Sequence, residues 1–190
     1  FYDLTMIVKK RWAIDFCQLV IDSGLKFEWQ LSSGTRSEAI TEEVSELLQK
    51  AGCTNISYAP ESGSKSVLNR IKKRISLDKL VQSIKDAEKN KIVCKSNILF
   101  GFPEETHKEV WQSMRFIKQL AFTNIHDLSI YPFSPYPGSA IFDQLRKNGK
   151  IPKTDDEYFY KLARSTEFGI FPPSYSEHFG DFSLGFYRIF

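Results

Sequence analysis

The acidic, basic and nucleophilic residues of this sequence offer few combinations that could carry out catalysis by themselves. Glu61 and Glu104 are the candidates for a general acid and a general base, but nothing near them indicates a matched pair with separated pKa values. The histidines, His107, His126 and His178, lie in helix-start, strand-edge and loop contexts that favour surface or structural roles. The dinucleotide-binding, P-loop, zinc-protease and nucleophile-elbow motifs are absent from the sequence, so these classes of enzyme have no support.

The three cysteines, Cys17, Cys53 and Cys94, are far apart in the sequence, and each has apolar neighbours. Metal-binding cysteines normally come from one short loop, because the loop fixes the geometry of the ligands. We therefore expect reduced cysteines in the core, and we predict no metal ligands among the residues of this chain.

The segments between the polar residues alternate between strand-like apolar runs and amphipathic helices. The expected strands are residues 1–4, 27–31, 55–58, 92–100 and 125–131. The polar residues expected to begin helices between them are Ser37, Ser76 and Thr106, and Gly24 is expected to end the first helix. This alternation favours parallel β/α units over separate layers of strands and helices.

Three further expectations concern particular helices. The first helix, residues 9–23, places Trp12, Phe16, Leu19 and Val20 at helical spacing, so these side chains are expected to be buried. Short helices are expected at residues 140–148 and 155–166. The aromatic segment 171–190 is expected to be rich in loops.

Polar and glycine-rich segments follow the strands at their carboxyl ends. They are Asp3 and residues 32–36, 60–64, 101–104 and 134–139. A barrel gathers such loops in one ring around a ligand, whereas an open doubly wound sheet uses mainly its switch point. The sequence therefore predicts an α/β fold, specifically a partial (β/α) TIM-like barrel of parallel strands with outer helices that lacks its first β/α unit.

Four phrases stand in order along the chain: SGTRSE, AGCTNISYAPESGS, NILFGFPEET and SIYPFSPYPGS. The series resembles the radical S-adenosylmethionine (SAM) superfamily, and within it the cobalamin-binding-domain-associated branch of oxidative-cyclase-like and methyltransferase-like enzymes. The resemblance covers residues 1–147. It implies a parent enzyme that binds SAM and uses 5′-deoxyadenosyl radical chemistry for methyl transfer or oxidative cyclisation of a small-molecule substrate.

The resemblance also assigns residues to SAM. It implies that Glu61 and Ser62 hydrogen-bond the ribose, because an ionised carboxylate accepts well from two vicinal hydroxyls. Arg36 is expected to bind the carboxylate of the methionine moiety through its guanidinium fork. Each assignment has a structural alternative, which is a helix N-terminal acid for Glu61 and an ion pair with Glu38 or Glu42 for Arg36.

Further contacts are implied around the adenine. The stretch from Asn97 through Gly101 to Glu104 corresponds to the family motif GxIxGxxE, although this chain has Asn and Leu where the motif has Gly and Ile. Asn97 and Gly101 are expected to approach the adenine, with a role only in shaping the turn as the alternative. The side chains expected to flank the adenine from the phrase YPFSPYPGS are those of Tyr131, Phe133 and Pro135.

The family holds a 4Fe–4S cluster with three cysteines of a CxxxCxxC loop after the first strand, and that spacing does not occur in this sequence. The resemblance therefore implies that the cluster ligands lie upstream of Phe1 in a longer parent protein and that this chain alone is inactive. Cobalamin is a further cofactor that the resemblance admits for the parent. Asp3 falls where the family often contacts the amino group of SAM. The alternative is a degenerate, non-catalytic barrel that serves as an interaction domain.

Composition limits the class of protein and its partners. A chain of 190 residues with 42% hydrophobic residues can bury a core, and we expect a barrel domain over residues 1–147 and a helical and loop extension over 148–190. A formal net charge of +3 is too small to predict a nucleic-acid partner. The basic cluster of Arg70, Lys72, Lys73 and Arg74 is interpreted as a solvated helix face or loop. The sequence has neither a leader nor an apolar run of about 20 residues, so a cytoplasmic location is expected.

Overall fold

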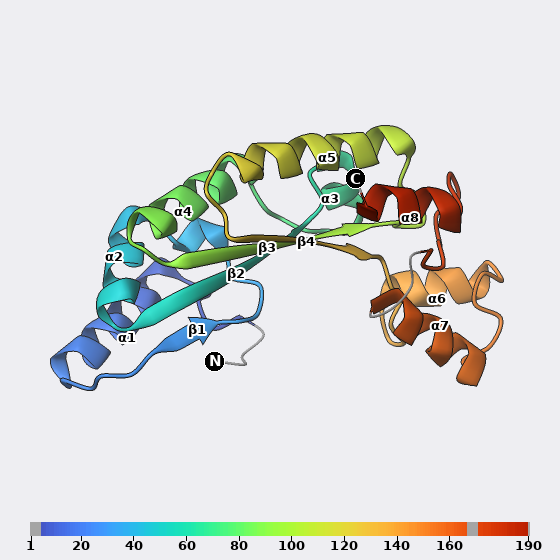
Figure 1. Ribbon diagram of the computed structural model, residues 1–190. Helices are drawn as coiled ribbons and strands as arrows, with labels where there is room; N and C mark the ends of the chain where they lie inside the picture. Colours follow the sequence, from blue (N-terminus) through green and yellow to red (C-terminus); the bar gives the residue numbers. More distant parts are fainter. Residues whose placement is uncertain (1–4, 167–170, 190) are drawn as a thin grey trace. The chain divides into compact units, whose positions relative to one another are not determined.

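A computed structural model describes residues 5–166 and 171–189, in which strands alternate with helices along the chain (Figure 1). The chain divides into two compact units, of which the first comprises Phe1–Ile98 with Gln112–Ser129 and the second Leu99–Trp111 with Ile130–Phe190. These units are parts of the chain that are compact in space, and they are not continuous in sequence. They do not test the expected boundary at residue 147 between a barrel domain and an extension, which stays a prediction.

The first unit carries most of the β/α elements. In chain order they are α1 (Lys10–Asp22), β1 (Trp29–Leu31), the 3-10 helix η1 (Ser37–Ala39), α2 (Glu42–Lys50), β2 (Cys53–Glu61), α3 (Lys65–Arg70), α4 (Leu77–Lys89) and most of β3 (Val93–Phe100). The chain passes between the units near the end of β3, then within α5 (His107–Ala121), and again within β4 (Asp127–Pro132). The second unit then continues through α6 (Ala140–Lys147), α7 (Asp156–Thr166) and α8 (Asp181–Ile189).

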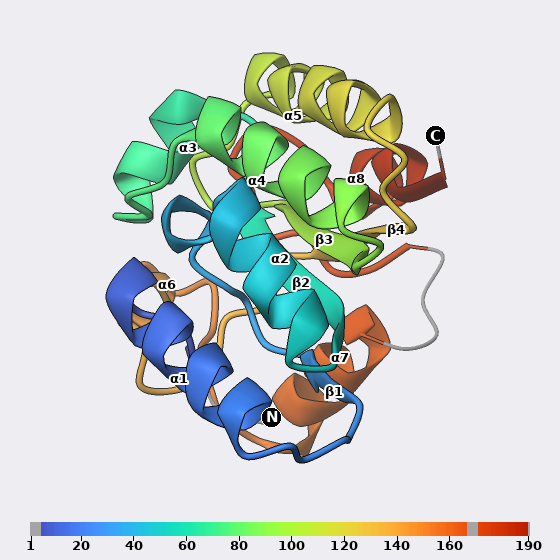
Figure 2. The ribbon, with the colours of Figure 1, turned by 90° about the vertical axis from the view of Figure 1, so that its left-hand side faces the viewer.

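The four strands form one parallel sheet in the order β1-β2-β3-β4. Along β2 and β3, buried side chains such as Ile56, Tyr58 and Cys94 alternate with half-buried ones, because successive residues of a strand point to opposite faces. Helices α2 and α4 lie over the buried face in Figure 2. The hydroxyl of Tyr58 lies 2.8 Å from that of Ser83 on α4, which joins helix to strand.

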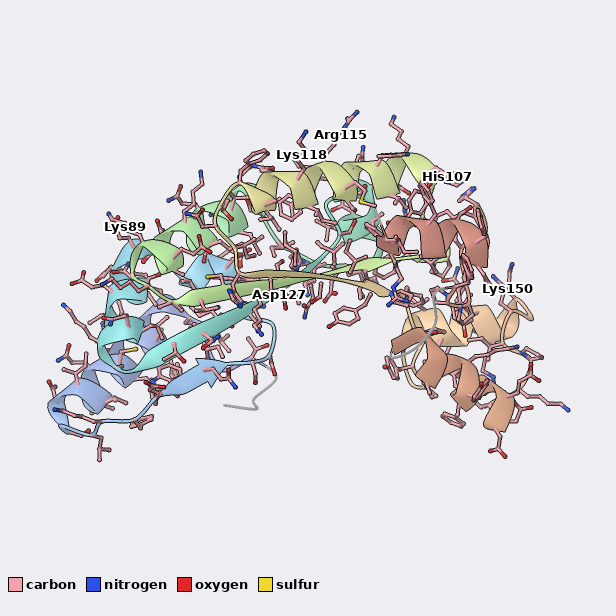
Figure 3. The ribbon with its side chains drawn as sticks, viewed as in Figure 1. Lys89, His107, Arg115, Lys118, Asp127 and Lys150 are labelled. Atoms are coloured by element: carbon pink, nitrogen blue, oxygen red, sulfur yellow. The ribbon has the colours of Figure 1, made fainter. Side chains whose placement is uncertain are left out.

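The α/β class with parallel strands and outer helices is therefore confirmed. The expected strand at residues 1–4 lies outside the described residues. The other four are found, although β2 is longer than the predicted 55–58 and reaches Glu61. Lys89 on α4 and Lys118 on α5 point away from the sheet in Figure 3, as expected for the charged faces of amphipathic helices.

Several predicted helix ends are confirmed. Ser76 caps α4 by accepting a hydrogen bond from the Lys79 amide. Thr106 precedes α5, where the Glu109 carboxylate accepts from the Thr106 amide at 2.9 Å and the hydroxyl of Thr106 accepts from the Glu109 amide, forming a capping box. Gly24 has a φ of +69°, the left-handed conformation of a residue that follows a helix.

One predicted helix start is wrong. Ser37 lies in the short helix η1, and α2 begins only at Glu42 after Thr41, whose hydroxyl accepts from the Val44 amide. Thr41 combines an N-cap hydroxyl with two acidic residues in the first turn, Glu42 and Glu43, which favourably oppose the helix dipole.

The buried face of α1 also differs from the expected one. Of the four side chains expected to be buried, Val20 is buried and Phe16 is half-buried, whereas Leu19 is 71% exposed and Trp12 is 45% exposed. The other buried residues of the helix are Ala13 and Cys17. Helical spacing predicted an apolar stripe correctly, but the small side chains of Ala13 and Cys17 turn toward the core in place of the large ones. The size of the apolar side chains therefore did not identify which face of α1 packs against the core.

Two helices were missed. Residues 65–70 form α3, and the segment expected to be rich in loops contains α8. Helix α8 packs through Leu184, which is fully buried, and a Cβ placed on Gly101 would lie 3.1 Å from a Leu184 methyl group. Phe182 on the same helix is 73% exposed. The density of aromatic residues in this segment obscured its helical period.

The three cysteines are free and buried, as predicted. Burial raises the pKa of the Cys17 thiol to about 11 and those of Cys53 and Cys94 to about 12, so all three are protonated at neutral pH. Among residues 5–166 and 171–189, His, Cys, Asp and Glu side chains form no cluster that could hold a metal ion. In the same residues, none of the helices is long and apolar enough to cross a membrane.

Candidate functional site

The carboxyl end of β2 combines a register shift with a left-handed residue. The pairing of β2 with β3 shifts register between Tyr58 and Glu61, and Glu61 then adopts a φ of +70°. This left-handed conformation is costly for a residue with a side chain. The Glu61 side chain is 24% exposed, and its Oε1 atom accepts a hydrogen bond from Lys73 Nζ at 3.0 Å.

The loop that follows Glu61 is held by α5. Ser62 is fully buried, and its hydroxyl lies 3.0 Å from that of Ser113 and accepts from the Ser64 amide. The Ser113 hydroxyl also accepts from the Gly63 amide at 3.0 Å. A Cβ on Gly63 would lie 2.4 Å from the Cβ of Phe116, so the loop and the helix approach as closely as glycine permits. The observed contacts of Ser62 fix the loop, and its contact with SAM stays a prediction.

The loop after β1 lies beside the same end of β2. The Thr35 amide donates to the Ser57 carbonyl at 2.9 Å, and a Cβ on Gly34 would lie 3.0 Å from the Cβ of Ala59. These contacts place the SGTRSE phrase within a few residues of Glu61 along β2.

Arg36 projects from this loop as an exposed side chain and makes no ion pair among the described residues. The alternative partners are engaged elsewhere, since Glu38 accepts from the Ser76 amide and Glu42 pairs with Lys89. Neither of the alternative ion pairs of Arg36 is therefore present among the described residues, and its contact with the SAM carboxylate stays a prediction.

Asn97 lies on β3 beside Ile98, the residue paired with Glu61 across the sheet, and it is half-buried. The first unit thus brings together three of the predicted residues, Arg36, Glu61 and Asn97, on the carboxyl-end portions of adjacent parallel strands and their loops. Asp3 lies outside the described residues.

In the second unit, Gly101 adopts a φ of +95° immediately after β3. Its amide donates to Glu105 Oε2 at 2.7 Å, and the Phe102 amide donates to the same oxygen at 3.3 Å. The buried acid that shapes this turn is therefore Glu105, whereas Glu104, which the motif alignment selected, is exposed. The two acids are adjacent in PEET, and the sequence alone gave no means of choosing between them.

The phrase YPFSPYPGS divides into buried and exposed residues. Phe133 is buried, with its ring centroid 4.8 Å from that of Phe102, and the carbonyl of buried Pro135 accepts a hydrogen bond from the Tyr158 hydroxyl. Tyr131 is 40% exposed. Of these three residues, Tyr131 presents an accessible aromatic face, while Phe133 and Pro135 pack inside the unit. Their contacts with adenine stay predictions.

The histidine on α5 has a structural role. His107 Nδ1 lies 2.5 Å from the hydroxyl of Tyr187 on α8, and burial together with the nearby Glu105 raises the pKa of Tyr187. This contact is a structural one, and the expectation that the histidines have no catalytic role stays a prediction.

The chemistry available at the end of β2 is recognition of a polar ligand. Arg36 supplies a guanidinium that can bind a carboxylate with two parallel hydrogen bonds, and Glu61 supplies acceptors for hydroxyl groups. The cysteines do not suit an iron–sulfur cluster, because they are buried thiols on three different elements, α1, β2 and β3.

Comparison with known proteins identifies the family. Residues 3–117 match the Radical SAM superfamily, and the chain belongs to this superfamily. Its members use SAM and a 4Fe–4S cluster.

Two relatives of known name are similar to this chain in sequence. The chain is 30% identical over 154 residues to an uncharacterized methyltransferase of Pyrococcus horikoshii, covering 80% of this chain and 32% of the relative. It is 28% identical over 125 residues to the threonylcarbamoyladenosine tRNA methylthiotransferase MtaB of Bacillus subtilis, covering 62% of this chain and 27% of that protein. The chain therefore spans about a third of the length of these relatives.

Solved structures support the fold. The radical SAM methyltransferase TsrM of Kitasatospora setae, determined with cobalamin and a 4Fe–4S cluster, superposes with a TM-score of 0.62 at 13% identity, covering 80% of this chain and 32% of TsrM. Coproporphyrinogen III oxidase of Escherichia coli, a radical SAM enzyme, superposes with a TM-score of 0.54 at 17% identity, covering 74% of this chain and 32% of that enzyme.

Proposed function

We propose that this chain is the SAM-binding part of a radical SAM enzyme that transfers a methyl group or cyclises a small-molecule substrate. The observation that carries the proposal is the placement of two charged side chains, Arg36 and Glu61, in neighbouring loops at the carboxyl ends of parallel strands. Arg36 makes no ion pair among the described residues, and the Glu61 side chain is partly exposed. SAM carries the complementary groups, a carboxylate on its amino-acid part and two vicinal hydroxyls on its ribose.

Within the first unit, Arg36 would bind the SAM carboxylate, Glu61 would accept from the ribose hydroxyls, and the half-buried side chain of Asn97 would offer an amide to the nucleoside. Ser62 contributes by holding the Glu61 loop against α5. Tyr131 and Gly101 belong to the second unit, and their contacts with adenine stay separate predictions.

A bound 4Fe–4S cluster would supply the electron that cleaves SAM to the 5′-deoxyadenosyl radical. The cysteines of this chain do not fit that cluster, so its ligands would come from other residues of the complete gene product, and the isolated chain would be inactive. Cobalamin in the complete protein and a cytoplasmic location belong to the same proposal. An RNA substrate, of the kind that the tRNA methylthiotransferases among the relatives are named for, is the competing outcome.

The test uses the complete gene product with its cluster reconstituted under anaerobic conditions. Reduction in the presence of SAM is expected to release 5′-deoxyadenosine, measured by chromatography. Arg36→Gln and Glu61→Gln should each weaken SAM binding about 10- to 100-fold, since each removes a charge-assisted contact. Asp78→Asn, which changes an exposed acid elsewhere in the first unit, is the matched control. Unchanged SAM affinity in both binding-site variants would refute the proposed site.

A further inference from the structure

We propose that Lys73 is a positioning residue that fixes the Glu61 carboxylate for a ribose, an inference that rests on the proposed function. Sequence reasoning assigned Lys73 to a solvated basic cluster with Arg70, Lys72 and Arg74. In the structure, Lys73 Nζ lies 3.0 Å from Glu61 Oε1, and the Lys73 side chain is 36% exposed. Lys72 and Arg74 are exposed and make no ion pair among the described residues.

The backbone of Lys73 is fixed by the end of α3. The Lys73 amide donates to the Leu68 carbonyl at 2.8 Å, and the Lys72 amide donates to the Asn69 carbonyl at 3.1 Å. Lys72 has a φ of +57°. These are the two hydrogen bonds and the left-handed residue of a Schellman motif. Since the turn reverses the chain immediately after α3, it delivers the Lys73 side chain to the end of β2.

The acceptor side is equally constrained. Glu61 follows a register shift in β2 and has a left-handed backbone, so its side chain leaves the strand in a direction that regular alternation would not give. Lys73 engages Oε1, whereas Oε2 has no hydrogen-bond partner among the described residues. One oxygen is thus anchored, and the other is left for a ligand.

The anchor matters because an unanchored glutamate must lose its rotational freedom when it binds. A carboxylate held in place before binding avoids that loss. The ion pair is partly exposed, and such pairs contribute little to folding stability. Removing Lys73 should therefore weaken ligand binding without unfolding the protein.

The experiment measures ligand affinity by anaerobic titration calorimetry with the complete, cluster-containing gene product. The probes are SAM and 5′-methylthioadenosine, a nucleoside that lacks the amino-acid carboxylate. Lys73→Gln should weaken both probes about three- to tenfold, the range expected when one side chain must be ordered on binding. Lys73→Arg, which keeps the charge, should largely restore affinity. Lys72→Gln, with the same charge change one residue away, is the control and should bind as the wild type does.

A double variant separates the possible roles of Lys73. If Lys73 acts through Glu61, adding Lys73→Gln to Glu61→Gln produces no further loss of affinity. A further loss in the double variant would show that Lys73 contacts the ligand itself and would overturn the proposal. Unchanged affinity in Lys73→Gln while Glu61→Gln weakens both probes would overturn the positioning role alone. Unchanged affinity in Glu61→Gln would overturn the proposed ribose contact and this inference with it.

Discussion

At the scale of single residues, the main feature of the loop after β2 is its close packing against helix α5 at Gly63. Gly63 has neither a positive φ nor a turn requirement, yet its Cα faces Phe116 and Ser113 of α5 at distances that exclude a methyl group. The sequence phrase ESGS marked this loop for chemistry, but the reason for the glycine, close approach of a helix, depended on a residue fifty positions away.

Gly63→Ala should therefore destabilise the protein by about 1–3 kcal/mol, because the new Cβ overlaps the Cβ of Phe116 and the Cα of Ser113. Urea denaturation of the purified chain measures the loss. Gly180→Ala is the matched control, since a Cβ there meets nothing within 4 Å and its φ is not left-handed. Equal stability of the two variants would contradict the tight contact between loop and helix.

At the scale of elements, local signals predicted well where one residue decides the outcome. Ser76 and Thr106 were identified as helix starts because a hydroxyl followed by helical spacing satisfies free amides at a helix N-terminus. The prediction failed where tertiary packing decides, as for the buried face of α1 around Ala13 and Cys17. Likewise, the ion pair of Lys73 with Glu61 was not predicted, because no residue near Lys73 in the sequence indicates that its side chain reaches the end of β2.

Helix α8 gives the clearest test at this scale. Leu184 is fully buried against Gly101, whereas Phe182 is largely exposed. Leu184→Ala should lower the free energy of unfolding by about 2–5 kcal/mol through the cavity that it leaves. Phe182→Ser should change it by no more than about 1.5 kcal/mol, because Phe182 is 73% exposed and loses mainly its stacking on the Phe171 ring. Hydrogen exchange of the α8 amides should accelerate in the first variant and not in the second; the reverse order would show that α8 packs through its other face.

At the scale of the whole molecule, the fold class followed from the alternation of strand-like runs with amphipathic helices, and the superfamily followed from the order of four phrases along the chain. Both predictions are confirmed. The division into compact units did not follow, because strands β3 and β4 and helix α5 each continue from one unit into the other. The spacing of apolar residues identifies a continuous helix or strand. It does not indicate the residue at which that element stops packing in one unit and starts packing in the next.

The buried thiols predict a pH dependence of stability. Burial raises their pKa values from 9.0 to about 11 for Cys17 and about 12 for Cys53 and Cys94. Above pH 9 the unfolded chain loses thiol protons that the folded chain keeps, so the free energy of unfolding should fall as pH rises. The limiting slope is about 1.4 kcal/mol per pH unit for each thiol.

Urea denaturation at pH 8 and pH 10 measures this effect. Tyrosines and lysines also titrate in that range, so the informative comparison is with Cys94→Ala, whose stability should fall less steeply between the two pH values. A thiol reagent at pH 8 should modify none of the three cysteines until the chain is unfolded. Rapid modification of the folded chain, or identical pH slopes in the two proteins, would contradict burial of the thiols.

The left-handed backbone of Glu61 has an implication for protein engineering. Glycine at this position would relieve a conformational penalty of about 1 kcal/mol, so a stability-guided redesign would replace the acid. That redesign would also delete the carboxylate proposed to hold the ribose. Position 61 is therefore a place where optimising thermostability and retaining the nucleoside ligand demand opposite substitutions.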